Sequence, residues 1–197
     1  MTGARSGSIL ARSLGLIGIL GGALLLAAFV ADIPPDLNGV RLVIFNAGAI
    51  AIVVAVYRRQ ASMAPTLAVV GALPAIAANA WHLVMVVLAT GQAAPFAGDF
   101  GLLYFIAAAA MWLADSLFGL VALRLGTVNR LAGLALAIGS VLAMAGMGRL
   151  ELTSPDNPTI FGPIALIGVA LNGIGWVLAG IEIVINGHVR EPTPNPA

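Results

Sequence analysis

The sequence contains no cysteine and no lysine, and charged residues make up only 9% of its 197 positions. Soluble domains carry about 25% charged residues, so this composition excludes a soluble globular protein. Without cysteine the chain has no disulfide framework, no thiolate nucleophile and no cysteine-ligated metal or iron–sulfur site. A net charge of +1 also provides no basic face that would attract nucleic acid.

Hydrophobic residues make up 60% of the chain and fall into six long segments. A bilayer core of about 30 Å needs roughly 20 apolar residues per helical span. Charges, prolines or glycines bound each segment, as is typical of helix ends. The predicted spans are Ser13–Ala31, Val40–Tyr57, Thr66–Thr90, Phe100–Arg124, Val128–Met147 and Ile160–Asn186. Because helices satisfy their own backbone in lipid, we predict an all-α polytopic membrane protein with a six-transmembrane-helix bundle.

The six spans form one predicted domain, residues 1–190, followed by a proline-rich tail, residues 191–197, expected to be disordered. If the spans alternate in direction, seven of the nine arginines lie on the side of both termini, and only Arg41 and Arg149 lie opposite. The positive-inside rule then predicts cytoplasmic termini in a bacterial-type plasma membrane. The first span also has the basic start and apolar run of a signal peptide, so its retention stays open.

Small residues recur one helical turn apart in several spans, as in Gly18-x-x-x-Gly22. In lipid, helices associate through close backbone contact, because burial from lipid supplies no hydrophobic driving force. We therefore interpret the glycines as packing residues and infer no function from them.

Asp115 is the most informative polar residue, because a charged side chain at membrane depth is costly. It lies near the middle of the fourth span, roughly 22 Å from the outer end of that helix by the helical rise. Arg124, nine residues further on, points to the opposite face and is no partner. We expect an uncharged carboxyl group, which in an apolar site is a candidate proton donor. The alternative is that Asp115 only makes an interhelical hydrogen bond.

Four other polar side chains are expected at a similar depth. Asn79 and His82 lie three residues apart in the third span and share a face, about 20–25 Å from its inner end. Asn46 in the second span and Asn172 in the sixth reach the same level. If these faces point inward, the residues share an interior space. For His82 alone, a hydrogen-bonded interior histidine is the simpler interpretation.

The three tryptophans also occur at mid-depth. Aromatic belts form at the span ends, and we assign Tyr104 to such a belt. A buried indole N–H needs an acceptor. Trp112 is three residues from Asp115, and Trp176 is four from Asn172, so each has a polar neighbour on its own face. Together with Trp81 they favour an indole-lined pocket, although each alone is compatible with simple core filling.

Glu182 lies in the last two turns of the sixth span, in an i, i+4, i+8 row with Asn186 and Arg190. This row is typical of a solvated interface, and an inward tilt would instead make Glu182 a second carboxylate for a binding site or proton path. His188 is too far from His82 to share a metal, so we expect no metal site. No nucleotide-binding or hydrolase motif occurs, and we expect no cofactor.

Three functions fit these residues. The first is a cofactor-independent acid–base enzyme of the cyclase or isomerase type acting on an isoprenoid or other lipid-like molecule. Asp115 would be the general acid, His82 the general base or an orienting group, and the tryptophans, asparagines and Glu182 the binding residues. The second is a small proton-coupled transporter or channel subunit. The third is a non-catalytic scaffold or partner subunit, and the sequence also permits a homo-oligomer.

The spans themselves favour the first of these functions. Transporters usually show discontinuous helices in matched halves, whereas here only Pro74 interrupts a span. A single mid-depth acid beside aromatic residues is more typical of a closed small-molecule pocket.

Overall fold

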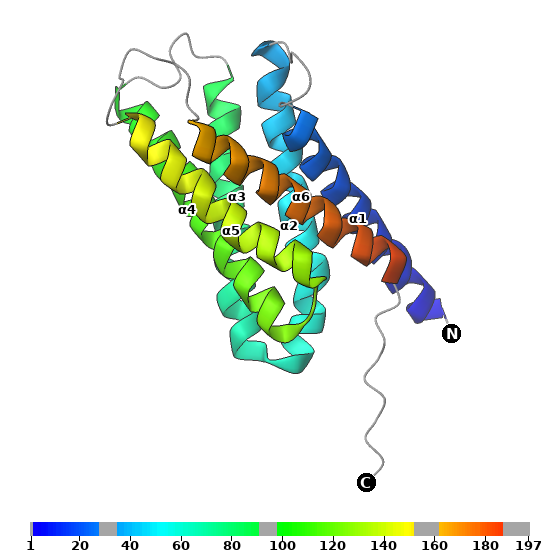
Figure 1. Ribbon diagram of the computed structural model, residues 1–197. Coiled ribbons are helices and arrows are strands. Elements are labelled where there is room, and N and C mark those ends of the chain that lie inside the picture. The colour runs from blue at the N-terminus through cyan, green and yellow to red at the C-terminus, as the bar shows by residue number, and fades with distance from the viewer. Residues whose placement is uncertain (1, 28–34, 91–97, 152–161, 187–197) are drawn as a thin grey trace.

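The structure, a computed structural model, describes residues 2–27, 35–90, 98–151 and 162–186, which form six helices and short connections (Figure 1). The helices are α1 (Thr2–Ala27), α2 (Pro35–Met63), α3 (Pro65–Ala89), α4 (Gly98–Leu125), α5 (Arg130–Glu151) and α6 (Pro163–Asn186). The predicted all-α class is confirmed. Each helix overlaps one predicted span, and α1 to α5 extend past theirs, because apolar runs mark the hydrocarbon-spanning part while helices continue into the interface. The proline-rich tail lies outside the described residues.

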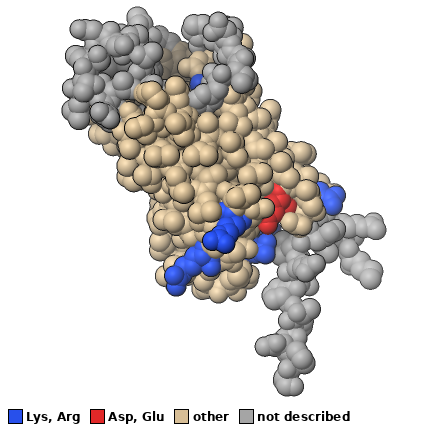
Figure 2. All heavy atoms as spheres, in the orientation of Figure 1, with Lys and Arg blue, Asp and Glu red and all other residues tan. Residues whose placement is uncertain are grey.

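Five helices, α1, α2, α3, α4 and α6, are long and apolar enough to cross a membrane. In α5 the apolar part, Arg130–Gly146, is shorter. Large apolar side chains cover the outside of the bundle, as with Leu73 at 62% exposure and Leu113 at 53%. Charged side chains gather mainly at one end of the face drawn in Figure 2, and the middle of that face shows none. This is the surface expected of a multi-pass membrane protein.

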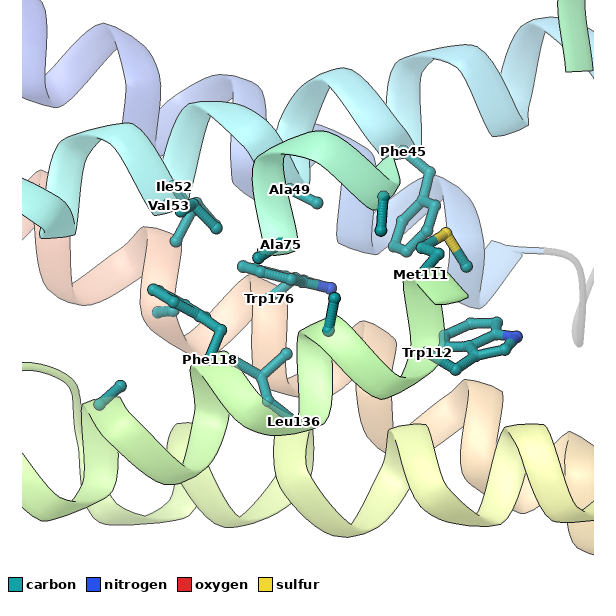
Figure 3. Close-up of a cluster of buried hydrophobic side chains, with 14 of the residues drawn as sticks. Phe45, Ala49, Ile52, Val53, Ala75, Met111, Trp112, Phe118, Leu136 and Trp176 are labelled. Atoms are coloured by element: carbon teal, nitrogen blue, oxygen red, sulfur yellow. The ribbon is translucent and has the colours of Figure 1, made fainter. Parts of the chain in front are cut away.

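The helices form a closed ring in which each packs against its neighbours in sequence and α6 packs against α1. α2 also contacts α4 and α6 across the centre. The main core cluster includes Phe45, Phe118, Leu136 and Trp176, which are almost completely buried (Figure 3). Polar groups carried on the inner faces of α3, α4, α5 and α6 therefore meet inside the ring.

Glycines allow the close helix contacts, as the sequence predicts. A Cβ atom added at Gly22 would lie 2.8 Å from the Gly173 backbone oxygen, where α1 meets α6. One added at Gly168 would lie 2.1 Å from the Ala143 backbone nitrogen, where α5 meets α6. Any larger residue would push these backbones apart. The tight contact between α5 and α6 positions part of the site described next.

Candidate functional site

Asp115 lies on the inner face of α4 and is completely buried. Asn79 of α3, also completely buried, donates a 2.8 Å hydrogen bond from Nδ2 to Asp115 Oδ1. The same Nδ2 donates at 2.9 Å to the Ala75 backbone oxygen one turn earlier. These two bonds fix the Asn79 amide with its nitrogen toward the carboxyl, so the orientation of one Asp115 oxygen is set by α3.

The second carboxyl oxygen, Oδ2, is buried and has no hydrogen-bond partner of normal geometry. Asn172 and Trp176, both on α6, act on the carboxyl as hydrogen-bonding neighbours. Their Oδ1 and Nε1 atoms also lack a partner of normal geometry. Buried polar atoms are usually satisfied, so several unpaired atoms around one carboxyl mark a site with unused bonding capacity.

Trp176 is held in place by packing. Its indole stacks on the ring of Phe118 with centroids 5.7 Å apart and planes 15° apart. Figure 3 shows the indole between Ala75 of α3 and Phe118 of α4, in the middle of the bundle. Because only 1% of this tryptophan is exposed, its N–H has no access to solvent at the surface.

Asn172 reaches a fourth helix. Its Nδ2 donates a 2.8 Å hydrogen bond to Ser140 Oγ on α5, and both residues are completely buried. Gly139, next to Ser140, makes this contact feasible, because a Cβ atom there would lie 2.6 Å from the Asn172 backbone nitrogen. The site, defined as Asn79, Asp115, Ser140, Asn172 and Trp176, thus joins α3, α4, α5 and α6. Among the described residues, no charged side chain acts on the Asp115 carboxyl.

A second buried pair lies one turn further along α3. Asn46 of α2 donates from Nδ2 to the Leu42 backbone oxygen at 2.7 Å, which turns its Oδ1 toward His82 Nδ1 at 3.1 Å. An amide oxygen only accepts, so Nδ1 carries the imidazole proton and Nε2 of the neutral ring is the proton-accepting nitrogen. Tyr104 packs edge-on against this ring, with centroids 5.3 Å apart.

The structure does not bring every predicted site residue together. Trp112 is buried but lies beside Phe45, with ring centroids 6.3 Å apart. Trp81 is 38% exposed on the outside of the bundle and does not face the interior, contrary to expectation. Glu182 accepts a hydrogen bond from the backbone nitrogen of Asn129, at the start of α5, so it lies at the bundle end and not beside Asp115.

Sequence reasoning missed Ser140, the partner of Asn172, and it wrongly assigned Tyr104 to an aromatic belt, whereas this residue is only 9% exposed. It also missed a buried hydrogen bond of 3.1 Å from Gln60 Nε2 to Thr127 Oγ1 near the ends of α2 and α4. The sequence signal that could have indicated these residues is a polar residue inside an apolar run, such as Ser140 after Gly139.

Among the described residues, no group of three His, Asp or Glu side chains is placed to hold a metal ion. Comparison with protein-family models, curated proteins and solved structures finds no match.

Proposed function

We propose that this chain is an integral membrane enzyme of the cyclase or isomerase type, in which Asp115 donates a proton to an isoprenoid or other lipid-like molecule. The observation that carries the proposal is the completely buried carboxyl group, with Oδ1 oriented by Asn79 and Oδ2 without a partner of normal geometry. An acid held in one orientation with one oxygen uncommitted is the arrangement that a general acid needs.

The surroundings of Asp115 support a neutral carboxyl group. Burying an isolated carboxylate costs roughly several kcal/mol of free energy unless a nearby cation compensates its charge. Among the described residues, no charged side chain acts on Asp115. Protonation removes that cost and makes the group a donor. The Trp176 N–H adds a hydrogen-bond donor beside the carboxyl, and one face of its indole is covered by the ring of Phe118.

His82 is the proposed base or orienting group. Asn46 holds its Nδ1 as the protonated nitrogen, so Nε2 has the lone pair that accepts a proton. On α3, His82 lies three residues from Asn79 and therefore on the same face. A donor and an acceptor of protons at neighbouring levels of one bundle suit the shift of a double bond or the closure of a ring, both of which need no net proton uptake.

We also propose that all six helices cross the membrane, with both termini in the cytoplasm. α5 starts at the end where α4 finishes and runs to the end where α6 begins (Figure 1), so it traverses the bundle despite its shorter apolar part. The positive-inside rule favours the cytoplasm for the end that carries most arginines. In the described helices these are Arg5, Arg12, Arg58, Arg59, Arg124 and Arg130, against Arg41 and Arg149 at the other end.

Deuterium labelling tests the enzymatic proposal on the lipids that the membrane itself supplies, whichever of them is the substrate. Membranes containing the wild-type protein or Asp115→Asn are incubated in heavy water, and the extracted apolar lipids are analysed by mass spectrometry. Proton transfer to carbon leaves deuterium that does not exchange back. We expect a labelled lipid species with the wild type, none with D115N, and equal amounts of folded protein in both. Labelling that D115N retains would remove Asp115 as the donor.

A second candidate, proton-coupled transport, is favoured by one observation. Buried polar pairs occur at three levels: Gln60–Thr127 near one end, Asn79–Asp115 in the middle, and Asn46–His82 beyond it. A pH-sensitive dye inside lipid vesicles containing the purified protein would report proton flux. Flux that D115N abolishes, with no labelled lipid in the deuterium experiment, would favour transport over catalysis.

A further inference from the structure

We infer that four arginines at one end of the bundle bind a phospholipid that carries two phosphodiester groups, one at each of two neighbouring corners. The α2 corner is Arg58 and Arg59, and the α4–α5 corner is Arg124 and Arg130. This inference involves neither Asp115 nor its proton and is independent of the proposed function. It rests on the contact that joins the corners, on their charge and on the apolar side chains next to them.

A buried hydrogen bond joins the two corners. Gln60 directly follows Arg59 in α2 and is completely buried. Its Nε2 donates at 3.1 Å to Oγ1 of Thr127, which is also buried. Thr127 belongs to the connection between α4 and α5, and Arg124 and Arg130 lie three residues to either side of it. The two arginine pairs, far apart in the sequence, are therefore neighbours at one end of the bundle.

The connection between α4 and α5 has a defined backbone. Gly126 has a φ of +60°, a left-handed conformation that favours glycine. The Thr127 backbone nitrogen donates at 3.1 Å to the Ala122 oxygen in the last turns of α4. At the start of α5, Asn129 Oδ1 accepts a 2.8 Å hydrogen bond from the Leu131 backbone nitrogen. The arginines that flank this turn are thus carried on fixed backbone, which lowers the ordering cost of binding.

The positive charge at this end is available to a ligand. All four arginines are exposed, and Figure 2 shows arginine side chains gathered at this end. Among the described side chains, Glu182 is the acidic one at this end. It accepts a hydrogen bond from the Asn129 backbone nitrogen, and no ion pair joins it to any of the four arginines. Because a guanidinium group stays charged at every physiological pH, the corners attract an anion under all conditions.

The residues next to the arginines favour a lipid over a soluble anion. Three of the four arginines have a large exposed apolar side chain four residues away, on the same helix face and toward the middle of the bundle. A phosphate held by these arginines has apolar protein surface directly below it for acyl chains, which a soluble anion would leave uncovered. The pairs are Arg58 with Val54, Arg124 with Leu120 and Arg130 with Leu134, with the apolar members 42%, 54% and 37% exposed.

The grouping of the arginines in pairs favours two phosphates. A guanidinium group matches the oxygens of a phosphate and binds it with two parallel hydrogen bonds. Each corner therefore provides donors for one phosphodiester. When two phosphates belong to one molecule, binding of the first raises the effective concentration of the second. A lipid with a single phosphate gains only one corner.

Native mass spectrometry of the intact protein in a non-ionic detergent tests this site. The protein is titrated with cardiolipin, which has two phosphodiesters, with phosphatidylglycerol, which has one, and with zwitterionic phosphatidylcholine. We expect cardiolipin to bind about tenfold or more tightly than phosphatidylglycerol, and phosphatidylcholine to bind least. Arg58→Gln and Arg124→Gln should each weaken cardiolipin binding about fivefold. Both side chains are exposed, so these variants should fold normally.

Arg12→Gln is the matched control, since it removes one exposed arginine at the same end. Arg12 lies on α1, which packs against α2 and α6 and makes no contact with α4 or α5. R12Q should change cardiolipin binding less than twofold. An equal loss in R12Q would show that net charge alone attracts the lipid and would overturn the site. Displacement of cardiolipin by inorganic phosphate or an acidic peptide at equal concentration would point to a soluble anion and would also overturn it.

Discussion

The contact between α5 and α6 allows a quantitative prediction. A methyl group added by Gly139→Ala would lie 2.6 Å from the Asn172 backbone nitrogen and 2.8 Å from the Gly168 backbone oxygen. Real Cβ atoms essentially never approach other atoms below 3.0 Å. Since the obstacle is backbone, the two helices must separate. Overpacking of this kind costs about 1–3 kcal/mol, and we expect G139A to lose that much free energy of unfolding.

Gly133→Ala is the matched control on the same helix, with the same change in helix propensity. Its added methyl group would meet the side chain of Leu123, at 2.5 Å from Cγ. Leu123 is partly exposed and can rotate away, so the loss should be smaller by about 1 kcal/mol or more. Equilibrium unfolding of both variants in mixed micelles with increasing sodium dodecyl sulfate gives the comparison. Equal losses in G139A and G133A would refute the close backbone contact as the origin of the effect.

Three further predictions use the same unfolding assay. Asn79→Leu should cost about 1–3 kcal/mol, because the buried carboxyl group that it serves loses its donor; a change below about 0.5 kcal/mol would contradict the hydrogen bond. Trp112→Ala should cost about 3–5 kcal/mol of unfolding free energy, as expected for a buried tryptophan. Trp81 faces outward, so Trp81→Ala should cost far less. The reversed order would show that the inward and outward tryptophans are misassigned. A double-mutant cycle with His82→Phe and Asn46→Leu should give a coupling energy of about 0.5–1.5 kcal/mol, and additive losses would argue against the pair.

Much of the candidate site could be predicted from the chain alone. Asp115, Asn79, Asn172 and Trp176 attract attention because polar groups and indoles are costly or rare in the middle of an apolar span. Only the tertiary structure shows that these residues meet inside the bundle and that His82 pairs with Asn46. Ser140 was not predicted, since a single serine is tolerated in any membrane helix through its own backbone.

The amino-acid sequence by itself determined that the chain is helical, apolar and multi-pass, because hydrocarbon thickness and backbone hydrogen bonding dictate the length and type of each segment. Only the tertiary structure decided which face of each helix is turned inward. In water, a hydrophobic stripe reveals that face, but here lipid and core are both apolar, so the stripe is missing. For this reason the sequence does not distinguish Trp81 from Trp176, which lie at similar depths. Trp81 is on the outside of the bundle and 38% exposed, whereas Trp176 is inside and 1% exposed.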